Sequence, residues 1–345
     1  MLYLPPKVFT RSPMTFSIIL PVRNGGDHVK DCVNSILGQT VRDFNLIVLD
    51  NYSSDGTTEW LQSLQDPRIQ LHPSDKPLGI VENWARIASV PKNEFITLIG
   101  HDDVLDSHYL ETMHQLIEQH PNASLYQAHF RFIDGHGQYK RNCLPMDEVQ
   151  KGHEFLACQL LATMDSTGTG YVMRSKDYDL LGGIPDYPNL IFADYELWTR
   201  LSLISYKATA LRECFSYREH TSTSFETNGE LYQLAFLRYM SFLQEITERH
   251  APVREVVTRY GRHYIYRYCE AMAHRLLKTK RSKRKTSVAA FIGQCRQMAA
   301  RLIPGQEFEP MNVFRIRLAV RLDSSALGRT AFRIAKKVLK TINKA

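Results

Sequence analysis

The sequence has no uninterrupted apolar run of about eighteen residues, so no membrane-spanning helix is expected. It has only six cysteines, with no C-x-x-C pair and no regular spacing, which argues against a zinc ribbon or a disulfide scaffold. Its first residues, MLYLPPKVFTRSPM, lack the apolar core of a signal peptide. We therefore expect a cytoplasmic protein with reduced thiols.

Acidic residues are scarce in the last third of the chain. Residues 229–345 hold 24 lysines and arginines against 8 aspartates and glutamates, whereas residues 1–228 hold 19 against 28. An acidic front part does not suit a nucleic-acid binder, and a basic rear part suits an anionic surface. We expect two domains, 1–228 and 229–345, and no nucleic-acid partner.

The front part does contain a regular alternation of strands and helices. Apolar runs bounded by turn residues predict buried strands at 16–22, 44–51 and 94–100, and a shorter strand at 68–73. Segments with helical spacing of apolar residues lie between them. The alternation predicts an α/β protein with a doubly wound sheet and flanking helices, followed by a mostly helical region after residue 228.

Polar residues follow three of these strands. The strand ends read PVRN at 21–24, LDN at 49–51 and HDD at 101–103. Ligands of doubly wound sheets bind outside the carboxyl ends of the strands, so we expect these side chains at one ligand-binding edge. Asp102 and Asp103 repel each other and need solvation or a partner, so a strand end with a helix cap and a cation site are both open interpretations.

Three segments, FSIILPVRNGGDHVKDCVNSILGQT, FNLIVLDNYSSDGT and NEFITLIGHDDVL, together resemble the donor half of the family-2 inverting glycosyltransferases. The resemblance covers roughly residues 14–225. It implies a GT-A-type mixed sheet, a nucleotide-sugar donor that we expect to be UDP-linked, and a glycan or glycolipid acceptor.

The resemblance also implies donor-binding residues at the strand ends. It gives Asp50 a hydrogen bond from the uracil ring N–H, with a cap of the following turn as the alternative. Asn51 stands where the family often has a second aspartate. Asn83 matches an asparagine near the donor, or it lies on a solvated helix face. The expected donor-binding residues are Pro21, Val22, Arg23, Asn24, Asp50, Asn51, Asn83 and Asp102.

A divalent cation, Mn²⁺ or Mg²⁺, is the cofactor that the resemblance implies. Asp103 would hold it, because hard cations prefer carboxylate and phosphate oxygens. Gly100 stands where many relatives have an aspartate. His220 is a second candidate ligand, with a structural role as the alternative. The side chain of His101 is expected to point to the opposite face from Asp102.

The resemblance places Asp194 in the role of catalytic base, at the start of a helix that follows a glycine-rich segment. An inverting transfer needs such a base to take the proton of the acceptor hydroxyl. An ordinary helix N-cap is the alternative. A helix N-terminus favours an ionised carboxylate, so we expect no strong elevation of its pKa. Glu196 and Arg200 are expected to hold the same loop in place.

Two basic features mark the C-terminal part. KTKRSKRK at 278–285 has six basic residues in eight, and residues 325–345 place apolar and basic residues on different faces of a helix. Such a helix suits an anionic bilayer surface, or it packs on its own domain with a solvated basic face. We expect an enzyme that is peripheral on the inner face of the membrane and takes part in bacterial surface-polysaccharide assembly.

Two other functions remain open. A sugar nucleotidyltransferase would need a glycine-rich, basic loop after the first strand, and PVRNGGD has two glycines with one cation. It would release pyrophosphate rather than UDP. A non-catalytic glycan- or membrane-binding protein would have no use for Asp50, Asp102, Asp103 and Asp194, and it would show no UDP binding.

Overall fold

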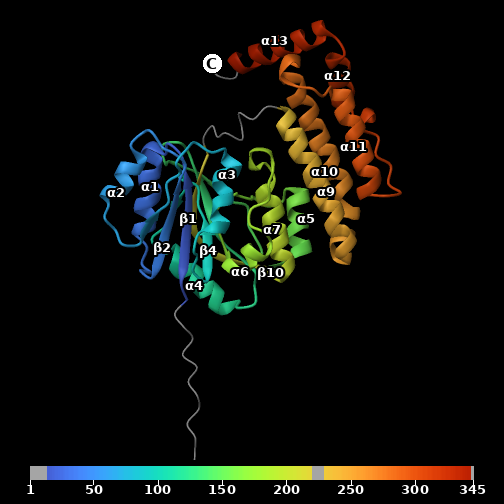
Figure 1. Ribbon diagram of the computed structural model, residues 1–345. Coiled ribbons are helices and arrows are strands. Elements are labelled where there is room, and N and C mark those ends of the chain that lie inside the picture. The colour runs from blue at the N-terminus through green and yellow to red at the C-terminus, as the bar shows by residue number, and fades with distance from the viewer. Residues whose placement is uncertain (1–13, 220–228, 343–345) are drawn as a thin grey trace, which may run out of the picture.

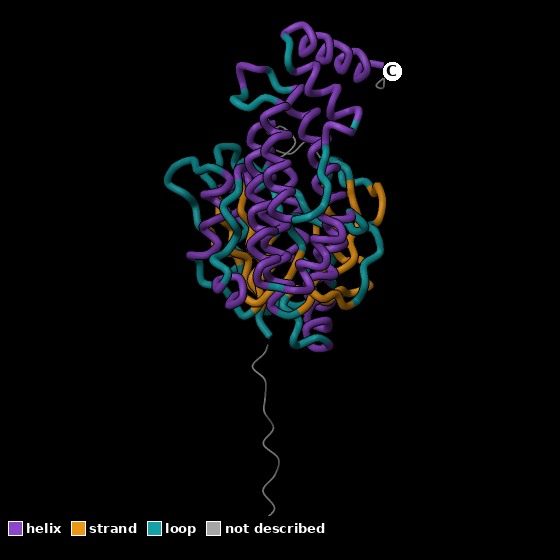
Figure 2. Tube along the Cα trace, turned by 90° about the vertical axis from the view of Figure 1, so that its right-hand side faces the viewer, coloured by secondary structure: helices purple, strands orange, loops and turns teal. Residues whose placement is uncertain are grey.

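The computed structural model describes residues 14–219 and 229–342. A ten-stranded sheet forms the body of the first range, and the second range is helical (Figure 1). The strand order is β3-β2-β1-β4-β9-β6-β10-β5, with β7 paired to β6 and β8 paired to β10. Figure 2 shows the helical part standing above the sheet, with its longest helices running down in front of it.

The first half of the sheet is parallel. β1 pairs with β2 and β4, and β2 pairs with β3. All seven residues of β1 are buried, as expected for a parallel strand covered on both faces. The predicted strands are confirmed, each to within two residues at its ends. The elements are β1 Phe16–Val22, α1 Gly26–Leu37, β2 Phe44–Asp50, α2 Thr57–Ser63, β3 Ile69–Leu71, α3 Ile80–Ala85 and β4 Phe95–Leu98.

The second half of the sheet is mixed. β9 is antiparallel to both of its neighbours, β4 and β6, whereas β6 and β10 are parallel to each other. The short strands β5, β7 and β8 add antiparallel pairings. The predicted mixed sheet with flanking helices is therefore confirmed. The elements are β5 Val104–Leu105, α4 Tyr109–Gln119, β6 Leu125–Ile133, β7 Tyr139–Asn142, β8 Val149–Lys151, α5 Gly152–Leu161, β9 Tyr171–Arg174, α6 Ser175–Leu180, α7 Ala193–Ile204 and β10 Tyr206–Arg218.

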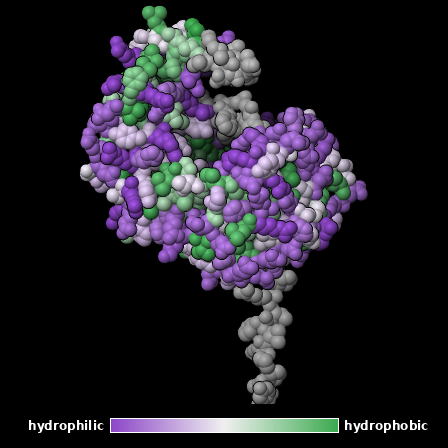
Figure 3. Space-filling model, turned by 180° about the vertical axis from the view of Figure 1, so that it is seen from behind, coloured by the Kyte–Doolittle hydropathy of each residue, from purple (hydrophilic) through white to green (hydrophobic). Residues whose placement is uncertain are grey.

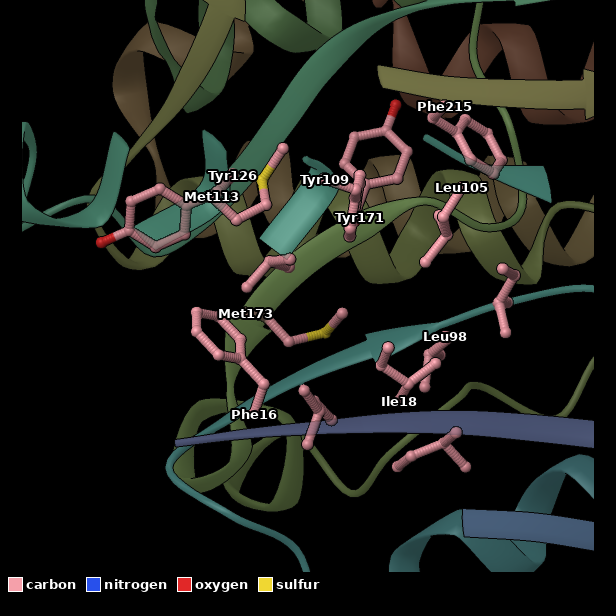
Figure 4. Packing of buried hydrophobic residues seen from close by; sticks show 14 of the residues in the cluster. Phe16, Ile18, Leu98, Leu105, Tyr109, Met113, Tyr126, Tyr171, Met173 and Phe215 are labelled. Atoms are coloured by element: carbon pink, nitrogen blue, oxygen red, sulfur yellow. The ribbon is translucent and has the colours of Figure 1, made fainter. Parts of the chain in front are cut away.

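The main hydrophobic core lies between the sheet and its helices (Figure 4). The ring of Phe95 packs 6.0 Å from that of Phe16 and 6.2 Å from that of Tyr126, measured between centroids. Such aromatic pairs add about 0.5–1.5 kcal/mol each beyond the burial of their area. The buried Tyr109 hydroxyl donates to the carbonyl of Gly170 at 3.2 Å. The core thus holds the loop that precedes β9.

A second hydrophobic cluster joins the C-terminal helices to the sheet body. It includes Leu156 and Leu160 of α5 and Ala193 at the start of α7, together with buried residues of the C-terminal helices. The predicted domain boundary near residue 228 therefore stays a prediction, because this cluster crosses it. The helices are α9 Gly229–Arg249, α10 Ala251–Lys278, α11 Val288–Leu302, α12 Phe314–Asp323 and α13 Ala326–Ile342.

Candidate functional site

A cavity of about 450 Å³ opens at the carboxyl edge of the parallel strands. Its lining combines the ends of β1 and β4, the loop before β9, the start of α7, the end of β10 and two residues of the C-terminal helices. Figure 3 shows a hollow between the sheet body and the helical part, with apolar residues inside it. Small-molecule sites typically have volumes of roughly 300–1,000 Å³. Four of the predicted site residues line the cavity: Pro21, Asp102, Asp103 and Asp194.

The two adjacent aspartates lie in the turn after β4. Asp103 is buried; its Oδ2 accepts a hydrogen bond from the Thr169 hydroxyl at 2.6 Å, and its Oδ1 accepts one from the backbone N–H of Arg218 at 3.1 Å. Burial, followed by the negative charge of Asp102, raises the pKa of Asp103 well above its usual range. The two adjacent carboxylates therefore repel each other in a buried setting, and this disfavours the ionised form of Asp103.

Gly100 explains how the two carboxylates reach their positions. A Cβ atom at this residue would lie 2.6 Å from Oδ1 of Asp102 and 3.1 Å from Oδ2 of Asp103. Both carboxylates therefore fold back over the glycine. An aspartate at position 100, as in the Asp-x-Asp-Asp pattern of many relatives, would not fit this arrangement without displacing Asp102.

Arg218, at the end of β10, is a functional residue that the sequence analysis did not identify. Its Nε donates to the carbonyl oxygen of Asp102 at 2.7 Å, and its guanidinium lies 3.3 Å from Oδ2 of Asp31 on α1. Together with its backbone bond to Asp103, these contacts hold the turn of the two aspartates in place. A contact across more than a hundred residues has no local sequence signal.

The contacts of Asp50 agree with both roles considered for it, a cap of the following turn and a hydrogen-bond acceptor for a bound base. Its Oδ2 accepts hydrogen bonds from the backbone N–H of Ser53 at 3.3 Å and from the hydroxyl of Thr58 at 3.0 Å, as in a turn cap. Its Oδ1 is buried and has no hydrogen-bond partner among the residues described. A buried acceptor without a donor is costly, so this oxygen is suited to the N–H of a bound base.

The loops after β1 and β2 are tied together beside the cavity. The backbone N–H of Asn24 donates to the Ser53 hydroxyl at 2.9 Å, and Oδ1 of Asn24 accepts from the N–H of Ser54 at 2.8 Å. Val22 is buried in the core, whereas Arg23 is exposed. These residues follow Pro21 but do not line the cavity themselves.

Asn51 and Asn83 are buried, and both have structural partners. The Asn51 amide exchanges two hydrogen bonds with the backbone of Leu78, at 2.7 and 2.9 Å. Nδ2 of Asn83 donates to the carbonyl of Leu49 at 3.3 Å, and its Oδ1 accepts from Arg86 at 2.9 Å. The solvated helix face suggested for Asn83 is therefore wrong: this side of the short helix α3 packs against β2.

Asp194 lies in the first turn of α7, partly open to the cavity and otherwise enclosed by protein. This enclosure raises its pKa to about 6, although backbone amides at the helix start act in the opposite direction. The expectation of no strong elevation was wrong because it considered only the helix N-terminus. Desolvation is the larger effect here.

Gly168 and Thr169 lie between the carboxylate of Asp194 and that of Asp103. A Cβ atom at Gly168 would lie 3.9 Å from Oδ2 of Asp194, and the next residue, Thr169, binds Asp103. Asp194 and the aspartate pair therefore approach the cavity from two sides of this loop. They are close enough for one ligand to contact both.

Glu196 holds the start of α7, as predicted. Its carboxylate accepts hydrogen bonds from the Tyr187 hydroxyl at 2.5 Å and from Nε of Arg200 at 2.7 Å. It is buried and does not line the cavity. Asp194 is therefore the carboxylate of α7 that a ligand in the cavity can reach.

The two predicted histidine placements have different outcomes. His101 lines the same cavity as Asp102, and the expectation that their side chains point to opposite faces stays a prediction. Strand β4 ends at Leu98, so the alternation of side chains along a strand no longer applies in the turn. His220 lies outside the described residues.

The described ranges, 14–219 and 229–342, contain no group of three or more histidine, cysteine and carboxylate side chains placed to hold a metal ion. Asp102 and Asp103 nevertheless present adjacent carboxylates whose mutual repulsion a cation would relieve. Mg²⁺ is commonly held by one or two carboxylates together with substrate phosphates. The pair therefore fits a hard divalent cation whose remaining ligands come from a diphosphate.

The C-terminal helices expose apolar side chains among basic ones. Phe314 and Leu318 of α12 are 65% and 40% exposed, and Leu327 and Ile334 of α13 are 85% and 59% exposed. Figure 3 shows apolar residues gathered at this tip of the molecule. Within the described parts of the chain, we find no helix of sufficient length and apolar character to cross a bilayer.

Comparison with known proteins finds similarity to sugar-transferring enzymes. Residues 17–181 match the model of glycosyl transferase family 2. Glycosyltransferase GlyG of Streptococcus pneumoniae serotype 4 is 25% identical over 125 residues, which cover 36% of this chain and 42% of that protein. TuaG of Bacillus subtilis (strain 168), a glycosyltransferase assigned to teichuronic acid biosynthesis, is 23% identical over 215 residues, which cover 61% of this chain and 81% of TuaG.

Solved structures share the fold. The crystal structure of S. aureus TarS 1–349 in complex with UDP-GlcNAc superposes with a TM-score of 0.60 at 10% sequence identity, covering 89% of this chain and 91% of that one. At this identity the likeness concerns the fold alone. The chain spans less than half the length of GlyG.

Proposed function

Because residues 17–181 of this chain match the model of glycosyl transferase family 2, we propose that it is a member of that family and transfers a sugar from a UDP-linked donor to a hydroxyl of a glycan or glycolipid, with inversion at the anomeric carbon. The observation that carries this proposal is the single cavity lined by Asp102, Asp103 and Asp194. The UDP-GlcNAc complex of TarS supports a UDP donor, and the assignment of TuaG supports a role in surface-polysaccharide assembly.

The nucleoside would bind at the ends of β1 and β2. Oδ1 of Asp50, buried and without a hydrogen-bond partner among the residues described, would accept the ring N–H of uracil. The tied loops at Asn24 and Ser53 would border the base, and Asp102 would contact the ribose. Asn51, Asn83 and Arg86 would act indirectly, by fixing the backbone around Asp50.

Asp103, assisted by Asp102, would hold Mn²⁺ or Mg²⁺ against the diphosphate. When bound, such a cation neutralises the negative charge that develops on the leaving group. Thr169 and Arg218 orient the Asp103 carboxylate, so its direction is fixed before the donor arrives. His220 stays a prediction as a further ligand.

Asp194 would act on the acceptor. The acceptor oxygen attacks the anomeric carbon from the face opposite the diphosphate and forms the new C–O bond. The bond between the anomeric carbon and the diphosphate oxygen breaks, and UDP leaves with that electron pair. The proton of the acceptor hydroxyl passes to the Asp194 carboxylate, which must be ionised to receive it.

A panel of nucleotide sugars tests this function directly. The chain is incubated with each sugar nucleotide and Mn²⁺, and free UDP, pyrophosphate and thermal stabilisation are measured. We expect a UDP sugar to raise the melting temperature and release UDP slowly by hydrolysis. Release of pyrophosphate would identify a nucleotidyltransferase instead, and no binding of any nucleotide sugar would favour a non-catalytic protein.

We also propose that the chain works at the cytoplasmic face of the membrane, attached by α12 and α13. Phe332 packs α13 onto α10 through His274, with ring centroids 6.3 Å apart, yet Leu327 and Ile334 remain exposed. Basic residues of the same helices, such as Arg315 and Lys336, are exposed as well. Apolar insertion and attraction to anionic lipid act together on such a surface.

Replacing Leu327 and Ile334 by glutamine should weaken binding to vesicles that contain anionic lipid by roughly tenfold or more, since each buried Leu or Ile contributes up to about 1.5–3 kcal/mol. Sedimentation with vesicles at low salt measures the effect, and the donor hydrolysis rate should not change. Leu180→Gln is the matched control, because Leu180 is 80% exposed on α6, which belongs to the sheet body. Equal vesicle binding by the double variant would rule out this surface.

A further inference from the structure

Part of the cavity wall has no role in the donor site. Tyr232 of α9 and Tyr268 of α10 line the cavity together with Asp194 and Tyr195 of α7. Both tyrosines of the C-terminal helices are half-buried, and both line the cavity. The cavity is therefore completed by residues that lie outside the segment matching the family model.

The rings of Tyr232 and Tyr268 both pack against other side chains of the protein. The guanidinium of Arg275 lies 3.9 Å from the centroid of the Tyr232 ring. The ring of Tyr268 stacks on Phe236, with centroids 5.1 Å apart and planes at 9°, and it also packs against Phe192 at 5.5 Å. Because their positions are fixed in advance, little side-chain entropy is lost when a ligand packs on them.

The aromatic wall formed by Tyr232 and Tyr268 also packs, through neighbouring side chains, against the residues that precede the predicted base, Asp194. Phe192 and Ala193, the two residues before Asp194, belong to the same hydrophobic cluster as α9 and α10. Phe192 stacks on Tyr239 of α9, with centroids 5.2 Å apart and planes at 12°. A ligand bound against the tyrosines is therefore positioned relative to Asp194 by direct packing.

The chemistry of the wall favours a sugar ring. A pyranose has an apolar face of C–H groups, which packs on an aromatic ring, and a rim of hydroxyls, which need polar partners. Tyrosine offers an apolar body and a polar tip, and the cavity adds the side chains of Asn189 and Asp194. A lipid chain offers no hydrogen bonds to these polar groups, whereas the hydroxyls of a sugar can donate and accept them.

We propose that Tyr232 and Tyr268 form the acceptor subsite, and that they stack on the terminal sugar ring of a glycan and hold its attacking hydroxyl at Asp194. The proposal rests on the transferase function proposed above. It assigns the C-terminal helices a part in acceptor recognition, separate from the membrane contact of α12 and α13.

The test compares transfer with hydrolysis. With the UDP sugar that the unaltered chain hydrolyses fastest, acceptor KM and kcat are measured on a panel of octyl monosaccharide glycosides, with octanol and a serine-containing peptide as acceptors that lack a sugar. We expect transfer to glycosides alone. Tyr232→Ala and Tyr268→Ala should each raise acceptor KM about tenfold, which corresponds to the loss of roughly one aromatic contact, and should affect donor hydrolysis much less than transfer.

Conservative and control variants complete the design. Tyr232→Phe and Tyr268→Phe keep the ring and should recover most of the acceptor affinity. Tyr260→Ala is the matched control, because Tyr260 is half-buried on α10 and does not line the cavity. If Tyr268→Ala unfolds, Tyr232→Ala still decides, since Tyr232 lies on a different helix, α9, and is packed at the edge of the hydrophobic cluster.

Three results would overturn the proposal: an unchanged acceptor KM in the folded alanine variants, equal use of octanol or the peptide, or a parallel loss of donor hydrolysis. Failure of the transferase function itself would look different. In that case the unaltered chain would hydrolyse no nucleotide sugar in the panel.

Discussion

Asp194→Asn should slow sugar transfer by about 10²–10⁴-fold, the range typical of general-base catalysis, while the affinity for UDP in the presence of Mn²⁺ stays unchanged. The amide has nearly the same shape as the carboxylate but cannot take a proton from the acceptor hydroxyl. The residues that we assign to the donor lie on the ends of β1, β2 and β4, so they keep their positions. Transfer rates and calorimetric UDP affinity, measured on the same preparation, separate the two effects.

The pH profile of the unaltered chain gives an independent measure. The pKa of Asp194 is raised to about 6 by its enclosure, and the base works only when ionised. The value of kcat/KM should therefore fall as pH drops below about 6, by a factor of ten for each further unit. In Asp194→Asn this limb should disappear from the residual activity.

Glu196→Gln serves as the matched control for Asp194→Asn. Glu196 is a carboxylate two residues further along α7 that binds Tyr187 and Arg200 and does not face the cavity. Glu196→Gln should transfer sugar at a rate much closer to that of the unaltered chain than Asp194→Asn does. If Asp194→Asn transfers at a normal rate, the base lies elsewhere. If it loses UDP affinity, Asp194 belongs to the donor site.

Asp103→Asn should abolish measurable turnover, a loss of roughly 10³-fold or more, because metal-ion stabilisation of a leaving group supplies several kcal/mol. Metal-dependent UDP binding should be lost with it. The fold should survive, since the amide oxygen can accept from the Arg218 N–H while the amide nitrogen donates to the Thr169 hydroxyl. A neutral side chain also removes the repulsion from Asp102, so the melting temperature should not fall.

Asp106→Asn is a suitable control for this variant, because Asp106 is a neighbouring carboxylate that binds Arg131 and does not line the cavity. Mn²⁺ titration followed by calorimetry with UDP distinguishes a lost metal site from a lost nucleotide site. Normal turnover of Asp103→Asn would remove Asp103 from the metal site.

The parallel half of the fold could be predicted because its signals are local. β1, β2 and β4 are short, mostly apolar runs that end at polar residues, and parallel strands place those residues at one edge. The antiparallel insertion of β9 between β4 and β6 could not be predicted in the same way. Its pairing depends on partners more than forty residues away, and its four residues have no distinctive pattern.

The residues of the site also divide into those with a local sequence signal and those that depend on distant contacts. Pro21, Asp102, Asp103 and Asp194 stand next to recognisable element ends, and they do line one cavity. Tyr232 lies in the first turn of α9, within a helical pattern in which an aromatic residue in the core and one facing a ligand look alike. Thr169, Arg218 and Tyr268 likewise act through contacts that only the folded chain creates.

Gly100 couples position 100 to the direction of the Asp102 side chain. Both carboxylates of the pair fold over its missing side chain, and any added Cβ would lie 2.6 Å from Oδ1 of Asp102. Because that oxygen ends a flexible side chain, a change of Gly100 to the aspartate of many relatives would turn the Asp102 carboxylate aside and add a third carboxylate in the same step. Comparing the two sequences position by position would therefore misplace the Asp102 carboxylate, because its direction depends on residue 100.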